Sequence, residues 1–136
     1  MWDMNEYFPI EKIDILGHSY KIICDPSSKA CEENLAPSAE DPKGLKGVII
    51  YQELTIYLDP GLSVSEKIQV LIHELLHGIS YHLTNSYLFG ESEREEENFI
   101  NLLSGTLSQT VLSTLREWSY GNQRTRKRAK TATSSI

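Results

Sequence analysis

Long apolar segments are missing from this sequence of 136 residues. No stretch approaches the roughly 18 consecutive apolar residues that a membrane-spanning helix needs, so we expect no transmembrane segment. The first residues, Met-Trp-Asp-Met-Asn-Glu, are acidic and precede no long apolar run, so we expect no signal peptide either. These absences favour a protein of the cytoplasm.

Cysteine is also scarce, with only Cys24 and Cys31 in the chain. In a cytoplasmic protein such a pair is expected to be reduced and structural. A metal site around the two thiols would need more ligands nearby, and the neighbouring sequence offers none.

The charge is distributed unevenly along the chain. Residues 1–120 hold all 19 acidic side chains and 8 of the 13 basic ones, a formal charge of −11, whereas residues 121–136 hold 5 basic side chains and no acid. We therefore predict one folded domain over residues 1–120 and a basic, disordered tail over residues 121–136. The acidic body repels nucleic acid, so any contact with nucleic acid would be weak and would use the basic segment 124–130.

The motif His73-Glu74-Leu75-Leu76-His77 predicts a metal site. Two histidines four residues apart lie one turn above each other on a helix, so both imidazoles can bind one zinc ion from the same side. Glu74 lies about 100° further round the helix, where it can act as a base on a water molecule at the metal. This is the H-E-x-x-H pattern of metalloproteases, which combines two ligands with a general base.

The motif lies in a segment with the other features of an amphipathic helix. Ser63 and Glu66 form a capping box at its start. Apolar residues then recur at helical spacing on a face that points away from the two histidines. They are Ile68, Leu71, Ile72, Leu75, Leu76, Ile79 and Leu83.

A second long helix is predicted from about Glu93 to about Trp118, with Ser92 and Glu95 as its capping box. Its expected apolar side consists of Phe99, Ile100, Leu103, Leu107, Val111, Leu115 and Trp118.

Short β-rich runs precede these helices. Residues 13–15 and 20–24 predict two strands, and residues 47–51 and 54–58 predict a hairpin. We therefore predict an α+β fold, in which a small N-terminal antiparallel sheet packs on the zinc helix and on the second long helix. Such a fold would be a minimal zincin-like domain.

A catalytic zinc ion needs a third protein ligand. The metzincin pattern requires glycine and histidine at the positions that Ser80 and Leu83 occupy, so that class is excluded. His82 lies about 140° from His77 around the helix and cannot join the pair. A carboxylate from the acidic run 93–97 remains.

Within that run we choose Glu97, which lies deepest in the second helix, and Glu96 and Glu93 stay open as alternatives. Asn101, one turn further on, is a candidate for a hydrogen bond that orients one of the metal-binding side chains. Tyr51 and Tyr81 are candidates for stabilising the oxyanion, together with His82 and Tyr87.

The segment Ile72-His-Glu-Leu-Leu-His77, preceded by a hairpin and followed by a glutamate near the start of a second long helix, resembles the ImmA/IrrE family of zinc metallopeptidases. In that family the second helix carries Glu-x-x-Ala and then, after three residues, Phe/Leu-Ala. Glu97-Asn-Phe-Ile100 and Leu103-Ser104 occupy these places here, so Ile100 and Ser104 replace the two alanines. The resemblance covers roughly residues 45–115.

The resemblance implies a gluzincin-like fold and a zinc-dependent endopeptidase that acts on an intracellular protein, such as a helix-turn-helix repressor of a phage or mobile element. The alternative is a non-catalytic protein-binding module that contains zinc and docks on a regulator. Glu74 argues against the alternative, because a structural zinc site needs no base.

Overall fold

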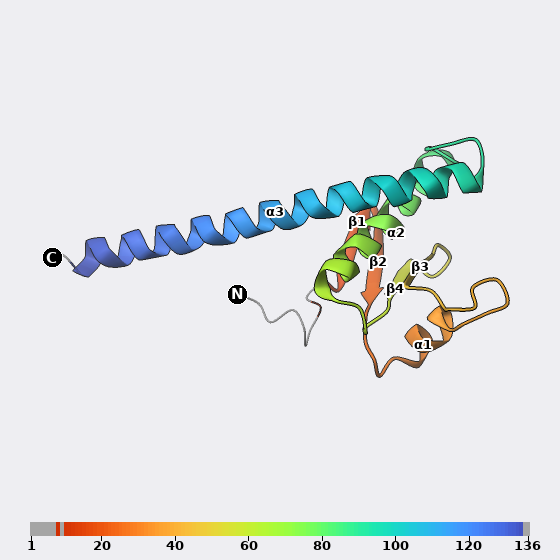
Figure 1. Ribbon diagram of the computed structural model, residues 1–136, viewed down its shortest axis with the longest axis horizontal. Coiled ribbons are helices and arrows are strands. Elements are labelled where there is room, and N and C mark those ends of the chain that lie inside the picture. The colour runs from red at the N-terminus through yellow and green to blue at the C-terminus, as the bar shows by residue number, and fades with distance from the viewer. Residues whose placement is uncertain (1–7, 9, 135–136) are drawn as a thin grey trace.

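A computed structural model describes residue 8 and residues 10–134 (Figure 1). This part of the chain forms a four-stranded sheet and three helices, which confirms the α+β class. The strands are β1 (Lys12–Ile15), β2 (His18–Ile23), β3 (Gly47–Ile50) and β4 (Thr55–Leu58), and the helices are α1 (Lys29–Leu35), α2 (Val64–Thr84) and α3 (Glu93–Ser134).

The sheet is mixed, with the strand order β1-β2-β4-β3. The two outer pairs, β1–β2 and β3–β4, are antiparallel, and the β3–β4 pair is the predicted hairpin. The central pair is parallel, with Ile22 opposite Ile56, so the expectation of a purely antiparallel sheet was wrong. A parallel pair needs a crossover connection, and the segment that contains α1 and β3 provides it.

Helix α2 packs closely on this sheet. A Cβ atom on Gly78 would lie 2.8 Å from Cδ1 of Ile15 and 3.1 Å from Cδ1 of Ile49, so this position has no room for a side chain. The predicted cap is confirmed, since Oγ of Ser63 accepts a hydrogen bond from the backbone N–H of Glu66. The buried core combines residues of the sheet and of α2: Phe8, Ile15, Tyr20, Ile22, Ile56, Leu58, Ile68 and Leu71.

Helix α3 is much longer than predicted. Its first part packs on α2, and its remainder projects beyond the body of the molecule (Figure 1). The predicted end near Trp118 was wrong, because the helix continues to Ser134. Residues 121–134, which were predicted to be disordered, belong to this helix, and residues 135–136 of the predicted tail lie outside the described residues. Glycine at position 121 costs a helix only about 1 kcal/mol, and the arginine, lysine, glutamine and alanine residues that follow favour helix. The predicted domain boundary at residue 120, with residues 121–136 dispensable for folding and zinc binding, stays a prediction.

The predicted apolar side of α3 is therefore only partly covered. Ile100 is fully buried, whereas Val111, Leu115 and Trp118 are 40%, 43% and 62% exposed. They lie in the middle part of α3, where the neighbouring Leu112 still packs against the core.

Both cysteines carry free thiols. The thiol of Cys31 is buried and donates to the carbonyl oxygen of Leu58 across 3.3 Å. Burial raises the pKa of both thiols, so neither has the features of a nucleophile. None of the helices in the described part of the chain is both long and apolar enough to cross a membrane.

Candidate metal centre

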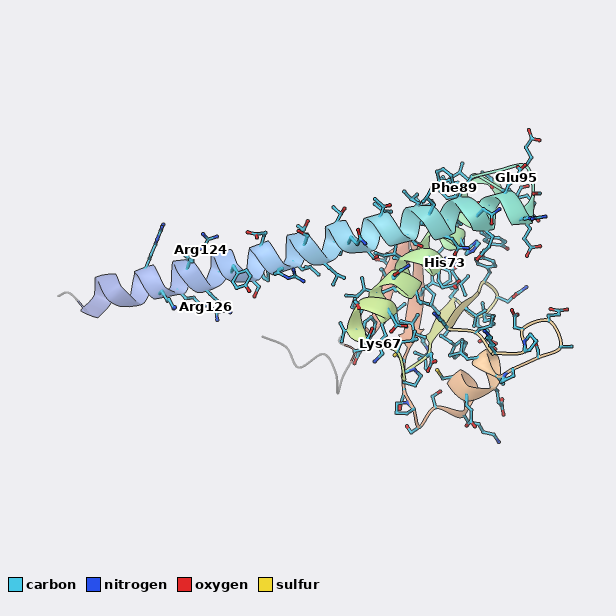
Figure 2. The ribbon with its side chains drawn as sticks, in the orientation of Figure 1. Lys67, His73, Phe89, Glu95, Arg124 and Arg126 are labelled. Atoms are coloured by element: carbon cyan, nitrogen blue, oxygen red, sulfur yellow. The ribbon has the colours of Figure 1, made fainter. Side chains whose placement is uncertain are left out.

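Three side chains that the sequence singled out converge between α2 and α3. Nε2 of His73 lies 3.0 Å from Oε1 of Glu97, and Nε2 of His77 lies 2.8 Å from Oε2 of the same carboxylate. One ligand atom from each residue lies within 4.8 Å of the other two. Figure 2 shows His73 on α2, close to α3.

The start of α3 determines which glutamate reaches the histidines. Oγ of Ser92 accepts a hydrogen bond from the backbone N–H of Glu95, as the predicted capping box requires. In this register Glu93 is exposed, and the buried side chain of Glu96 is bonded to Ser80 instead. The structure therefore brings Glu97 to the histidines and leaves both alternative glutamates outside the cluster.

The donor set fits a zinc ion. Two imidazole nitrogens and a carboxylate are the ligands of one common type of catalytic zinc site. Ligand atoms at about 2.0–2.2 Å from a tetrahedral ion lie roughly 3.3–3.5 Å apart. The measured separations of 3.0 Å and 2.8 Å from the imidazoles to the Glu97 oxygens require only a small outward movement to match.

Glu74 lies beside the cluster and is almost fully buried, with 7% of its surface exposed. Burial, and secondarily the charge of Glu97, raise the pKa of Glu74 from 4.5 to about 8, and a backbone hydrogen bond from Ile49 in β3 opposes this shift. A cation held by His73 and His77 would lower that pKa again. Burial also lowers the pKa of His73, which favours the neutral imidazole that a metal requires.

An open cavity of about 300 Å³ adjoins His73 and Glu74. Its wall is mixed polar and apolar and comes from the start of β3, from α2 and from α3. The remaining lining residues are Lys46, Gly47, Glu66, Gln69, Val70, Asn101 and Ser104. Lys46 and Gln69 were not anticipated, although Gln69 lies one turn before His73 on the same helix and could have been found by that spacing.

Asn101 was predicted to orient a metal ligand. Its side chain instead lines the cavity, and within the described chain it makes no hydrogen bond to His73, His77 or Glu97. Its position therefore suits contact with a molecule bound in the cavity better than orientation of a metal-binding side chain.

The two tyrosines predicted for the oxyanion lie together elsewhere. The rings of Tyr51 and Tyr81 are stacked, with their centroids 3.9 Å apart. The hydroxyl of Tyr51 donates to the carbonyl oxygen of His77 across 3.4 Å, and burial raises its pKa far above the ordinary value. Tyr51 thus supports the backbone of the motif helix, and neither tyrosine lines the cavity beside Glu74.

The two remaining histidines lie outside the group formed by His73, His77 and Glu97. The rings of His18 and His82 are stacked with centroids 3.9 Å apart, and the hydroxyl of Tyr20 lies 2.6 Å from Nε2 of His82. Burial and the neighbouring His18 lower the pKa of His82.

The chain matches no protein-family model, no curated protein and no solved structure.

Proposed function

We propose that this protein is a zinc-dependent endopeptidase of the H-E-x-x-H type. The observation that supports this most directly is the approach of Glu97 to His73 and His77, with Glu74 buried beside them. Three ligands and an adjacent base are the minimum set for hydrolysis of a peptide bond at a metal.

Each residue has a defined task in this proposal. His73, His77 and Glu97 would hold the ion, which supplies Lewis acidity and lowers the pKa of bound water toward about 7. Glu74 accepts the proton that water loses during attack on the carbonyl and delivers it to the leaving amine. The backbone N–H of Ile49 bonds to the Glu74 carboxylate and helps to fix its direction.

The position of β3 supports a peptide as substrate. It is an edge strand of the sheet, and its first residue, Gly47, lines the cavity beside His73 and Glu74. An exposed sheet edge can bind an extended peptide through backbone hydrogen bonds. A peptide along β3 would bring its backbone close to the proposed ligands.

We propose an intracellular protein as the substrate and the cytoplasm as the site of action. The resemblance of the 72–77 segment to the ImmA/IrrE family supports a helix-turn-helix repressor of a phage or mobile element as one such substrate. Contact with nucleic acid would be weak and would use the exposed basic side chains around Arg124 and Arg126 on the projecting part of α3 (Figure 2).

A second candidate is a non-catalytic module that contains zinc and binds a regulator. The exposed apolar residues Val111, Leu115 and Trp118 favour it, because such a helical stripe can dock on another protein. The buried base Glu74 favours the enzyme, because a module that only binds has no use for it.

The experiment that tests the proposal is hydrolysis of a fluorogenic peptide library by the purified, zinc-loaded protein. Cleavage that is lost with a chelator and restored by zinc supports the enzyme. Absence of cleavage from a protein that binds about one zinc ion per chain contradicts it and favours the binding module.

A further inference from the structure

The carboxylate next to Glu97 in the sequence has a buried partner of its own. Glu96 and Ser80 are 5% and 1% exposed, and the hydroxyl of Ser80 donates a hydrogen bond to Oε1 of Glu96. Ser80 belongs to α2 and lies about one turn after His77, and Glu96 belongs to the first turn of α3. The contact thus joins the two helices that contribute the metal cluster, close to a cluster residue on each side.

Ser80 also forms a hydrogen bond with the loop that connects α2 and α3. The backbone N–H of Leu88 donates to Oγ of Ser80 across 2.9 Å. The hydroxyl has one proton, which goes to Glu96, since the other acceptor in reach, the carbonyl oxygen of Ser86, is 3.4 Å away. A Cβ atom on Gly90 would lie only 2.6 Å from Cβ of Glu95, so the connection is closely packed as well.

Because the contact between Ser80 and Glu96 is buried, it favours one arrangement of α3 on α2. A carboxylate and a hydroxyl taken out of water are unfavourable unless they bond to each other, so a rotation or shift of α3 that separates them is disfavoured. Consecutive residues of a helix point about 100° apart. Fixing the direction of Glu96 therefore also fixes the direction in which Glu97 leaves the helix.

We propose that Ser80 and Glu96 are positioning residues, which set the register of α3 on α2 and so hold Glu97 against His73 and His77. This inference rests on the zinc site of the proposed function. It assigns the neighbouring glutamates different tasks: Glu97 binds the ion, and Glu96 fixes the direction of the Glu97 side chain.

The test is the zinc dissociation constant of the purified full-length protein, measured by competition with a chromogenic chelator. Ser80→Ala and Glu96→Ala should each weaken zinc binding by about 10–100-fold, the usual effect of removing a group that orients a ligand. Ser80→Thr keeps the hydroxyl, and Glu96→Gln keeps an acceptor oxygen without the charge. Both conservative variants should bind zinc nearly as tightly as the wild type.

Ser108→Ala is the matched control, because Ser108 is a buried serine of α3, 3% exposed, whose hydroxyl donates to the carbonyl of Gly105. It removes a buried hydroxyl that bonds only within α3, so it should leave zinc affinity unchanged. Replacement of zinc by Co²⁺ gives a second readout, since its visible spectrum reports the ligands. Ser80→Ala should shift that spectrum toward the spectrum of Glu97→Gln.

Two results would overturn the inference. If Ser80→Ala and Glu96→Ala bind zinc as tightly as the wild type, the pair is merely structural. If Glu96→Gln binds as weakly as Glu96→Ala, the charge of Glu96 matters and not its position. A wild-type protein that binds no zinc would instead contradict the proposed function, and the inference would fall with it, so the two failures are distinguishable.

Discussion

Nε2 of His77 lies 2.8 Å from Oε2 of Glu97, although 20 positions separate the two residues in the chain. The first residue lies in the middle of α2 and the second in the early part of α3. Their contact therefore depends on how the two helices pack, and it converts a two-histidine motif into a cluster of three potential ligands.

Removal of one histidine tests the cluster directly. We expect the purified protein to hold about one zinc ion per chain. His77→Ala should lose most of it, because the two remaining ligands, His73 and Glu97, bind zinc far more weakly than three. The measurement is metal content after dialysis. His82→Ala is the control, since His82 lies on the same helix but is stacked on His18. Equal zinc content in wild type and His77→Ala would disprove the site.

The third ligand can be tested within one turn of α3. Glu97→Gln should weaken zinc binding, because the amide is a poor zinc ligand. Glu95→Gln should leave zinc affinity unchanged, since the Glu95 carboxylate accepts a hydrogen bond from the backbone N–H of Glu91 at the helix start. Loss of that capping contact costs about 0.5–2 kcal/mol of stability at most. Indistinguishable zinc affinities in the two variants would remove Glu97 from the site.

The sequence predicted those parts of the site that local geometry determines. Histidines at positions 73 and 77 share a helix face wherever the helix packs, and Ser63 with Glu66 marks where that helix begins. The choice of Glu97 used the same periodicity on the second helix.

Features that depend on long-range packing were not predictable in this way. The parallel pairing of β2 with β4 joins strands that are not neighbours in sequence, so no turn between them indicated it. The bond between Ser80 and Glu96 could not be foreseen, because a serine on a helix gives no sign of its partner. The length of α3 was underestimated because basic composition was taken as disorder, whereas arginine and lysine are good helix formers.

The raised pKa of Glu74 predicts a pH dependence of stability in the metal-free protein. In the folded chain Glu74 keeps its proton up to about pH 8, whereas in the unfolded chain it releases it near its ordinary pKa of 4.5. The folded state thus binds more protons between these values, and the Glu74 contribution lowers the free energy of unfolding as pH rises, by at most about 1.4 kcal/mol per pH unit.

Glu74→Gln lacks this contribution. The free energy of unfolding of the variant should therefore rise relative to that of the wild type as pH increases across that window. Urea unfolding of both proteins with a chelator present measures the difference. The contribution of His73, whose lowered pKa has the opposite sign, is common to both proteins and largely cancels. A difference that stays constant with pH would show that Glu74 is not buried as described.

Truncation tests the projecting part of α3. A chain that ends after Tyr120 should melt close to the full-length protein and bind zinc equally well, because side chains 122–129 are all exposed. Circular dichroism should show the loss of helix without a loss of cooperativity. A large drop in melting temperature would mean that this segment packs on the body.

If Glu74 is the base of a peptidase, Glu74→Gln should be unable to cleave peptides. The substitution keeps the size of the side chain and removes its basicity. Zinc content should match the wild type, while the rate of cleavage of a peptide that the wild type hydrolyses should fall by at least about 10²–10⁴-fold. Cleavage by Glu74→Gln at the wild-type rate would show that Glu74 is not the base.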